Sequence, residues 1–319
     1  MRQYIARRLL LFIPTLFVAS LAIFIMMRIV PGDVAQVILG GEGTDALALE
    51  RVETLRAELG LADPLPIQYG RWLWSMVNGE FGGRSLIDKE PLAAIVARRW
   101  PVTFQLALYA IIFSVVISVP MGVLAAVKQD RWPDYLVRVF TIAGHAVPSF
   151  WLALVLILVL AVYFNWTPPL RYQALWQDPL AHLQKVVWPV LVLGWSFSSN
   201  IARVTRSNML EVLRQDYIRT ARSKGLIDGT VLWRHALRNA LIPVTTLTGL
   251  QLASLLSGTV ILESIFGLPG MGQGIVLAAN ARDYPVVQSM AMFLVVAMLT
   301  LNLLIDLLYA FIDPRIKYR

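Results

Sequence analysis

Long apolar runs, separated by short polar and often basic loops, dominate the chain. A helix that spans a membrane needs about 20 predominantly apolar residues. Six stretches reach or approach this length: 9–29, 101–127, 136–163, 186–206, 241–262 and 286–311. The pattern predicts an all-α integral membrane protein with six transmembrane helices.

The first run, Leu9 to Met27, directly follows Arg7 and Arg8 and could be mistaken for a signal peptide. Its apolar part is longer than the roughly 7–15 residues of a signal peptide, and no small-x-small cleavage site follows it. We therefore expect it to be retained as a span.

The fourth and fifth runs are more polar than the others. The fourth ends in "GWSFSSNIARV", and the fifth is rich in Thr, Ser and Gly. Spans of this kind usually pack against protein or line a pathway instead of facing lipid.

Lysine and arginine mark one side of the membrane, because cytoplasmic loops carry an excess of them. They cluster at the N-terminus, after the second span, in the loop at about 207–240 and in the C-terminal "DPRIKYR". In a six-span chain these four places share one side, so we expect both termini and that loop to be cytoplasmic. Three parts follow: 1–30 with the first span, an extracytoplasmic cap at 31–100, and a core domain at 101–319.

Composition agrees with a membrane protein. Hydrophobic residues make up 57% of the 319, against roughly 45–50% in soluble domains. We attribute the net charge of +8 to the cytoplasmic loops and not to nucleic-acid binding. The absence of cysteine excludes disulfides, thiolate chemistry and cysteine zinc sites.

No catalytic or metal motif is present in the sequence. It contains neither the GxxxxGK[ST] phosphate loop nor HExxH, and its histidines, His145, His182 and His235, are scattered. We expect no metal site, no catalytic residue and no ATP hydrolysis by this chain, and a buried, hydrogen-bonded His145.

The loop between the fourth and fifth spans has the pattern of a helical hairpin. Read as one helix, 208–225 places Leu210, Leu213, Tyr217 and Ala221 on one apolar stripe. Gly225 is suited to the left-handed conformation that ends a helix.

The hairpin continues into the fifth span. Gly229 permits a second turn, and "TVLWRHALRNALIP" begins the next helix. A partner with a groove could grip the first helix, and its displacement would pass directly to the spans. Ordinary cytoplasmic charge explains the basic residues, but it does not require the two glycines.

The segment "DYIRTARSKGLIDGTVLWRHALRNALIPV" resembles the coupling loop of ATP-binding-cassette (ABC) importer permeases. That motif is Glu-Ala-Ala, a glycine after a three-residue gap, and a later proline. Thr220, Ala221 and Arg222 occupy the first three positions here, with Gly225, after a gap of two residues instead of three, and Pro243 at the others. Only the middle alanine matches the general triplet, and "RTARSKG" is similar instead to the peptide-transporter branch.

Stretches along essentially the whole chain are similar to the same branch. They are "RIVPGD", "LGLADPLPIQYGRWLW", "RWPVTFQLAL", "PSFWLAL" and "ESIFGLPGMGQGIVLAANARDYPVVQ". The large segment after the first span resembles the B-type subunit of dipeptide, oligopeptide, nickel and glutathione importers.

The resemblance implies a permease subunit of the bacterial plasma (inner) membrane, with 101–319 as its core permease domain. It would form half of a translocation pore, and a homologous permease would form the other half. Two ATPase subunits, which hold the ATP and Mg²⁺, would bind its coupling helix, and an extracytoplasmic solute-binding protein would dock outside. It implies these residues for the ATPase contact: Tyr217, Thr220, Ala221, Arg222, Ser223 and Gly225.

Two further groups of residues are candidates. Polar residues that could line the pathway are Gln105, Ser114, Ser198, Asn200, Thr248, Gln251, Ser254 and Ser257. The last three are spaced to make one face of the fifth span polar, although helix–helix packing explains them almost as well. An external gate or docking loop could be formed by Gly267, Pro269, Gly270, Gly272 and Gly274.

Other classes of function remain as alternatives. A stand-alone secondary transporter or channel would be expected to show inverted repeats and charged sites at the membrane midplane, and neither is visible. An intramembrane enzyme would need a nucleophile–base or metal pair within the spans. A pure scaffold would not need the polar fourth and fifth spans.

Overall fold

A computed structural model describes residues 2–29, 53–54 and 62–312. Within these ranges the chain is helical apart from turns, irregular loops and one isolated β-bridge between Arg84 and Pro91, which confirms the all-α prediction. The last four residues of "RIVPGD", 30–33, lie outside the described residues. So do much of the predicted cap and the basic C-terminal segment.

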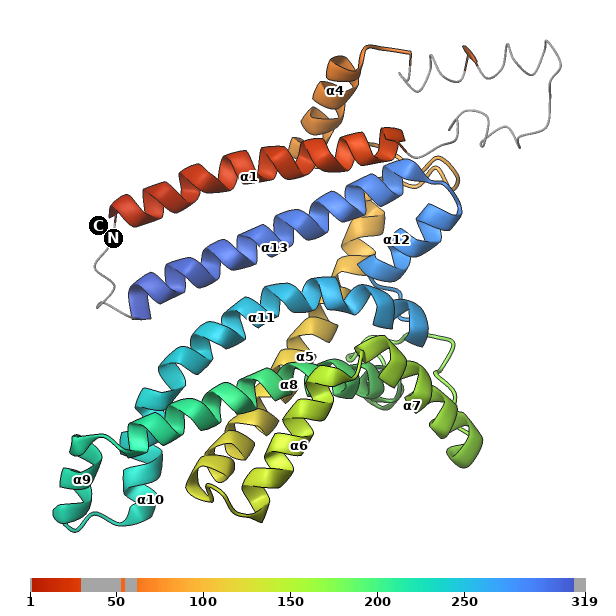
Figure 1. Cartoon of the computed structure of the whole chain (residues 1–319). Helices are drawn as coiled ribbons and strands as arrows, with labels where there is room; N and C mark the ends of the chain where they lie inside the picture. Colours follow the sequence, from red (N-terminus) through yellow and green to blue (C-terminus); the bar gives the residue numbers. More distant parts are fainter. Residues whose placement is uncertain (1, 30–52, 55–61, 313–319) are drawn as a thin grey trace. The chain divides into compact units, whose positions relative to one another are not determined.

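The helices follow one another along the chain in Figure 1. They are α1 (Arg2–Ile29), α4 (Leu65–Val77), α5 (Leu92–Val127), α6 (Trp132–Ala146), α7 (Ser149–Phe164), α8 (Pro179–Leu213), α9 (Asp216–Ser223), α10 (Asp228–Thr230), the π-helical η1 (Val231–Ala236), α11 (Leu237–Phe266), α12 (Met271–Asn280) and α13 (Tyr284–Ile312).

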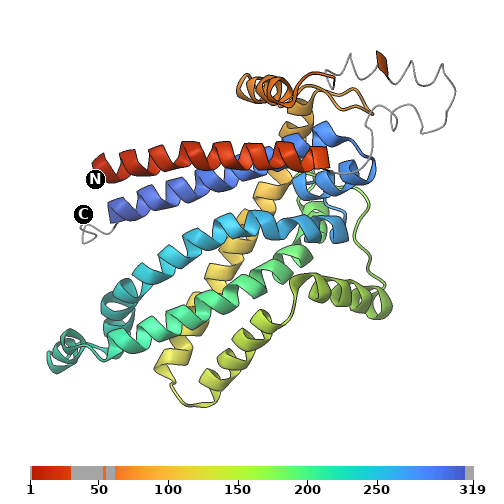
Figure 2. The same cartoon turned by 45° about the horizontal axis from the view of Figure 1, so that its top comes forward.

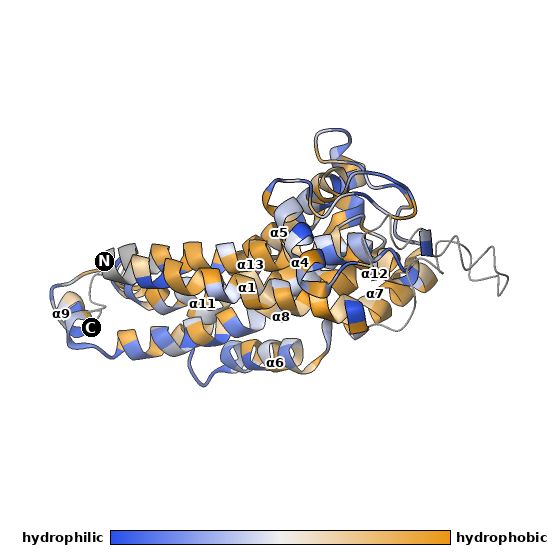
Figure 3. Cartoon of the chain, turned by 90° about the horizontal axis from the view of Figure 1, so that it is seen from above, coloured by the Kyte–Doolittle hydropathy of each residue, from blue (hydrophilic) through white to orange (hydrophobic). Residues whose placement is uncertain are grey.

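Four described helices are long and apolar enough to cross a membrane, and a bent pair raises the number to five if it counts as one span. The four are Ile5–Ile29, Leu92–Val127, Asp228–Phe266 and Tyr284–Leu307. Figure 3 shows the long hydrophobic stretches of α1, α11 and α13 and the more hydrophilic α6 and α9. The predicted fourth span lies in α8, which is too polar to pass the same test, so a count of six stays a prediction.

The third predicted span, 136–163, is not one continuous helix. α6 and α7 meet at 102°, with Val147 and Pro148 in extended conformations between them. Proline lacks the N–H that continues a helix, and it biases the preceding residue away from helical geometry. The hydrophobic run has the length of one span, but the helix is broken at Val147 and Pro148.

The described residues form two compact units, 2–29 with 53–54, 62–102 and 269–303, and 103–268 with 304–312. In the first, the start of α5 packs against α12 and α13 through a cluster that includes Leu92, Met271 and Met290. The 81–90 segment is fastened to the same unit because the Ser85 hydroxyl and the Leu86 N–H both donate to Asp283. Glu90 accepts two bonds from Arg98, and this hydrogen-bonded guanidinium lowers the pKa of the Glu90 carboxyl.

In the second unit, α8 is the central helix and packs against α6, α7 and α11 (Figures 1 and 2). Small residues permit close approaches. A Cβ added to Gly122 of α5 would lie 2.6 Å from Thr205 Cβ and 2.7 Å from the Ala202 carbonyl oxygen. Gly144 of α6 likewise faces Ser199 of α8 with no room for a side chain.

Gly122→Ala is expected to lower the stability of the chain by roughly 1–3 kcal/mol, the usual cost of overpacking. The new methyl would meet backbone, which cannot move aside without separating α5 from α8. Thermal unfolding in mild detergent measures the loss. Gly258→Ala is the control, because its Cβ meets only Leu193 at 3.8 Å. Equal unfolding temperatures for the two variants would contradict the close approach.

Candidate functional site

α9 is a separate eight-residue helix at one end of α8 and α11 (Figures 1 and 2). The prediction of one helix over 208–225 is wrong, because α8 ends at Leu213 and Gln215 is extended (φ −72°, ψ 149°). The break reorients α9 relative to the stripe expected from the sequence. Tyr217 is 42% exposed, whereas Ile218, which the stripe omitted, is fully buried.

Two side chains fasten α9 to the second unit. Ile218 is 0% and Ala221 8% exposed, and they are the buried residues of this helix. Both belong to an apolar cluster built by α5, α8, α9, η1 and α11: Val123, Ala126, Met209, Ile218, Ala221, Val231, Ala236, Leu237 and Ala240. Because so short a helix is marginal by itself in water, this packing is what holds it.

Gly225 ends α9 as predicted. Its φ is +78°, the left-handed conformation, and two backbone hydrogen bonds close the helix around it. Leu226 N–H donates to the Ala221 carbonyl over 3.4 Å, and Gly225 N–H donates to the Arg222 carbonyl over 2.9 Å. This is the pairing of a Schellman motif.

The second glycine does not act as expected. Gly229 lies within α10 and its φ is not positive, so the prediction of a turn at this residue is wrong. Residues 224–227 connect α9 to α10 instead. The next helix does run on into the fifth span, through the π-helical η1 and α11 to Phe266, as the sequence predicted.

α9 is also tied to α11 by a polar contact. The Tyr217 hydroxyl accepts a hydrogen bond from Asn239 Nδ2 over 2.8 Å. Together with the apolar cluster, this bond links α9 to a helix that is long and apolar enough to cross a membrane. A force on α9 is therefore applied to α11 as well.

The outward side of α9 presents short polar and basic groups. Thr220 and Ser223 are exposed, and their hydroxyls donate to carbonyls of their own helix. Arg222 pairs with Asp228 at 3.3 Å, and both side chains are more than half exposed.

Exposed apolar side chains flank this polar side. Ile227 is 78% and Trp233 58% exposed, and Leu226 is also exposed. No pattern in the sequence singled out these residues. Aromatic and arginine side chains are enriched in protein interfaces, so the mixed surface suits a partner protein.

The candidate pathway residues of α5 and α8 are mostly engaged within the second unit. Gln105 donates to the Tyr109 hydroxyl and accepts from that of Tyr172. Ser114 and Ser198 are fully buried and donate to backbone carbonyls, Ser114 to that of Gly194.

Asn200 lies in a different setting, a pocket of about 200 Å³ between α6 and α8. It accepts from Arg203, and His145 lines the same pocket. The expectation of a buried His145 is wrong, because the break after α6 leaves its side chain exposed at the helix end.

The candidates on α11 differ in exposure. Ser254 and Ser257 are exposed, whereas Gln251 is 7% exposed, so a polar face of all three residues stays a prediction. The Gln251 Oε1 has no hydrogen-bond partner within the described residues. Thr248, one turn before, is half-buried and donates to the Val244 carbonyl.

The glycine-rich segment after α11 is a loop only in part. Gly267 closes α11 with φ +62°, and Gly270 precedes α12. Gly272 and Gly274 are buried inside α12, so their expected place in a loop is wrong. Gly274 is needed there because a Cβ would come within 2.9 Å of Arg99 and Met290. Pro269 is half-buried between the two helices.

Residues 118–318 match the family described as the inner membrane component of binding-protein-dependent transport systems. Residues 1–107 match the N-terminal part of the membrane component of such systems. The chain belongs to this family.

Two relatives match over whole length. The glutathione transport system permease protein GsiC of Escherichia coli is 37% identical over 319 residues, and all of both chains is covered. A protein of Brucella abortus, named as a candidate peptide transport system permease, is 40% identical over 318 residues, again over all of both chains.

Solved structures agree at the level of the fold. An inward-facing structure of the MetNI methionine ABC transporter is similar with a TM-score of 0.54 and 17% identity, covering 70% of this chain and 99% of that one. A structure of an amino acid ABC transporter with histidines gives 0.51 at 15% identity, covering 68% and 94%.

These matches confirm the resemblance drawn from the sequence. The chain is a permease subunit of an ABC importer, a non-catalytic membrane component, and ATP hydrolysis belongs to its partner subunits. The relatives support this reading over a stand-alone secondary transporter or channel.

Proposed function

We propose that the chain forms one half of a translocation pathway for peptides or similar small solutes in the inner membrane. A homologous permease forms the other half, two ATPase subunits supply ATP and Mg²⁺, and an extracytoplasmic binding protein delivers the solute. The names of the full-length relatives, which refer to peptide and glutathione transport, support this solute class.

The observation that carries the coupling role is the fastening of α9. Its inward side is buried among α5, α8, η1 and α11, while its outward side is exposed. An ATPase that grips the exposed Thr220, Arg222 and Ser223 moves α9, and the apolar cluster passes that movement to the long helices. Ala221 and Gly225 act by shaping this surface, Ala221 from beneath and Gly225 at its end.

The basic residues around α9 support a cytoplasmic position for this helix and for both termini. Arg214, Arg219, Arg222 and Lys224 are all exposed around α9. This is the side on which ATP is available. The glycines around α12 then lie toward the outer face, where Gly267 and Gly270 flank a turn that a binding protein could contact.

Gly225→Val is expected to impair coupled transport. An added Cβ meets no atom within 4 Å, so the effect comes from backbone strain at φ +78°. Left-handed geometry costs an L-residue roughly 1–2 kcal/mol, and more for a β-branched one. Solute-stimulated ATP hydrolysis by the reconstituted complex measures the effect.

Gly229→Ala is the matched control for this variant. It has the same open surroundings but lies in helical α10, where alanine is favoured over glycine by roughly 0.5–1 kcal/mol. The expected result is normal coupling. Equal losses in both variants would show that the left-handed turn is not the cause.

The proposed function is tested by purifying the tagged chain in gentle detergent and identifying what accompanies it by mass spectrometry. The expected companions are a second permease and ATPase subunits, and the complex should transport peptides into liposomes only with ATP. A chain that purifies alone and moves solute without ATP would overturn the proposal in favour of a secondary transporter.

A further inference from the structure

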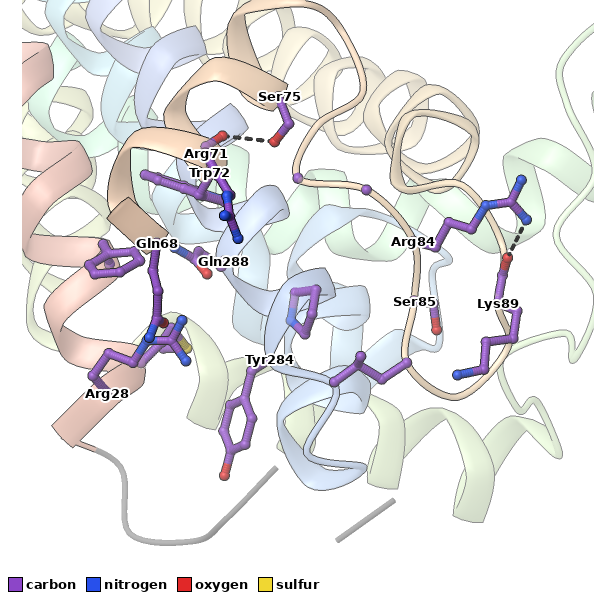
Figure 4. A pocket seen from close by; sticks show the side chains of 16 residues that line it. Arg28, Gln68, Arg71, Trp72, Ser75, Arg84, Ser85, Lys89, Tyr284 and Gln288 are labelled. Atoms are coloured by element: carbon purple, nitrogen blue, oxygen red, sulfur yellow. Dashed lines mark hydrogen bonds between the residues drawn. The ribbon is translucent and has the colours of Figure 1, made fainter. Parts of the chain in front are cut away.

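A cavity of about 480 Å³ lies in the first unit (Figure 4), whereas α9 belongs to the second. Its walls come from the last turns of α1, from α4, from the 82–89 segment and from the first turns of α13. Its volume falls within the range of roughly 300–1,000 Å³ that is usual for small-molecule sites. None of the coupling or pathway candidates lines it.

The cavity is positively charged. Among the described residues, its lining contains four basic residues and no acidic one: Arg28, Arg71, Arg84 and Lys89. The charge of Arg71 is offset by an ion pair with Asp63, and Arg84 donates a hydrogen bond to the Lys89 carbonyl. Asp283 binds Ser85 and Leu86 of the wall but does not itself line the cavity. Arg28 and Lys89 have no carboxylate partner among the described residues, so the lining favours an anion.

Two buried donors in the lining are also unused. Gln288 is 8% exposed, and within the described part of the chain its Nε2 has no hydrogen-bond partner. The same holds for the buried Trp72 Nε1. Figure 4 places both side chains on one side of the cavity, with Arg84 and Lys89 across from them. Because buried donors in folded proteins are nearly always paired, these two indicate that a bound ligand supplies the acceptor.

The cavity lies at the ends of two helices that are apolar enough to span the membrane. Arg28 is in the last turn of the first, Ile5–Ile29, and Tyr284 is the first residue of the second, Tyr284–Leu307. The ends of such spans lie at the level of the lipid headgroups, where Trp and Tyr are also enriched. The apolar Phe24 and Met27 continue the lining along α1.

We propose that this cavity binds the phosphate-bearing headgroup of an anionic phospholipid. Gln288 Nε2 and Trp72 Nε1 donate to the phosphate oxygens, and Arg28 and Lys89 select for net negative charge. The acyl chains follow the apolar surface of α1. The site would fasten α1 and α4 to the membrane surface, and it does not depend on the coupling role proposed for α9.

The test is native mass spectrometry of the purified full chain, in its complex, after reconstitution in nanodiscs of equal phosphatidylglycerol and phosphatidylcholine. The wild-type chain is expected to retain phosphatidylglycerol preferentially. Arg28→Gln should weaken retention roughly fivefold, the usual contribution of one cation at a membrane surface. Gln288→Leu and Trp72→Phe should each weaken it roughly tenfold through loss of a donor to a charged group.

Arg131→Gln is the control, because it removes one exposed positive charge from the start of α6, far along the chain from the cavity. Trp72→Phe keeps an aromatic ring in place, so it tests the loss of a donor even if the Gln288 variant misfolds. Unchanged retention in all three cavity variants, or an equal loss in Arg131→Gln, would overturn the proposal. Displacement of the lipid by excess inorganic phosphate would also overturn it, since free phosphate would then be the ligand.

Discussion

Ala221→Arg is expected to abolish coupling to the ATPase while the chain still inserts into the membrane. Ala221 is 8% exposed within the cluster that fastens α9. A larger side chain there costs roughly 1–3 kcal/mol in overpacking, and burying its unpaired charge adds several more. Burial of Ile218, the other anchor, stabilises the packed position of α9 by only roughly 1.5–3 kcal/mol. The balance favours release of α9 from the cluster.

The readouts are recovery of the ATPase with the tagged chain and solute-stimulated ATP hydrolysis. The amount of chain in the membrane fraction reports insertion, which should be unchanged because the apolar spans are intact. Gln215→Arg is the control: it adds the same charge at the exposed N-cap of α9, outside the surface assigned to the ATPase. It leaves the anchoring through Ile218 and Ala221 intact, so ATP hydrolysis should stay coupled to the solute. Normal coupled transport by Ala221→Arg would sink the assignment of α9.

The sequence predicted best where one physical effect dominates. Long apolar stretches require a membrane, and α1 and α13 correspond to the predicted first and sixth spans. Gly225 was predicted correctly because a helix that ends before a glycine strongly favours left-handed closure. Gly229 gave the same local indication of a turn, but it lies within the helical turn of α10.

The errors arose where packing decides between local alternatives. The apolar stripe through Tyr217 is possible only for an unbroken helix, and the extended Gln215 redirects burial to Ile218. Pro148 was visible in the sequence, but hydropathy alone cannot show that a run bends by 102°. The same bend exposes His145.

The largest loss of stability is expected from Asp134→Asn. The Asp134 side chain is fully buried, yet it holds α6 to α8 through a paired charge. Arg206 Nε and Nη2 donate to its two oxygens over 2.6 and 2.7 Å, Arg138 donates to both as well, and the Asp130 N–H adds a fifth bond. Nothing in the linear pattern joins residue 134 to residue 206, so this contact was beyond sequence reasoning.

Asparagine keeps the size of Asp134 but removes the charge, which leaves Arg206 facing no anion. Removing one partner of a buried pair costs roughly 3–5 kcal/mol. Thermal unfolding in detergent is the measurement. Arg138→Gln is the matched control: its side chain is 40% exposed and Arg206 remains paired, so a much smaller loss is expected. Equal unfolding temperatures for the two variants would show that the buried pair carries no stability.

A compensating double variant separates charge from shape. Asp134→Leu with Arg206→Met replaces the pair by apolar side chains, which proteins often tolerate without loss. Recovered stability would show that the ion pair is dispensable for holding α6 to α8. Coupled transport by that variant then tests whether α6 moves together with α8. Because α8 leads directly into α9, a helix clamped to α8 has to follow it when the ATPase displaces α9. If the clamp transmits this movement, coupled transport should be impaired in Asp134→Asn and should return together with stability in the double variant.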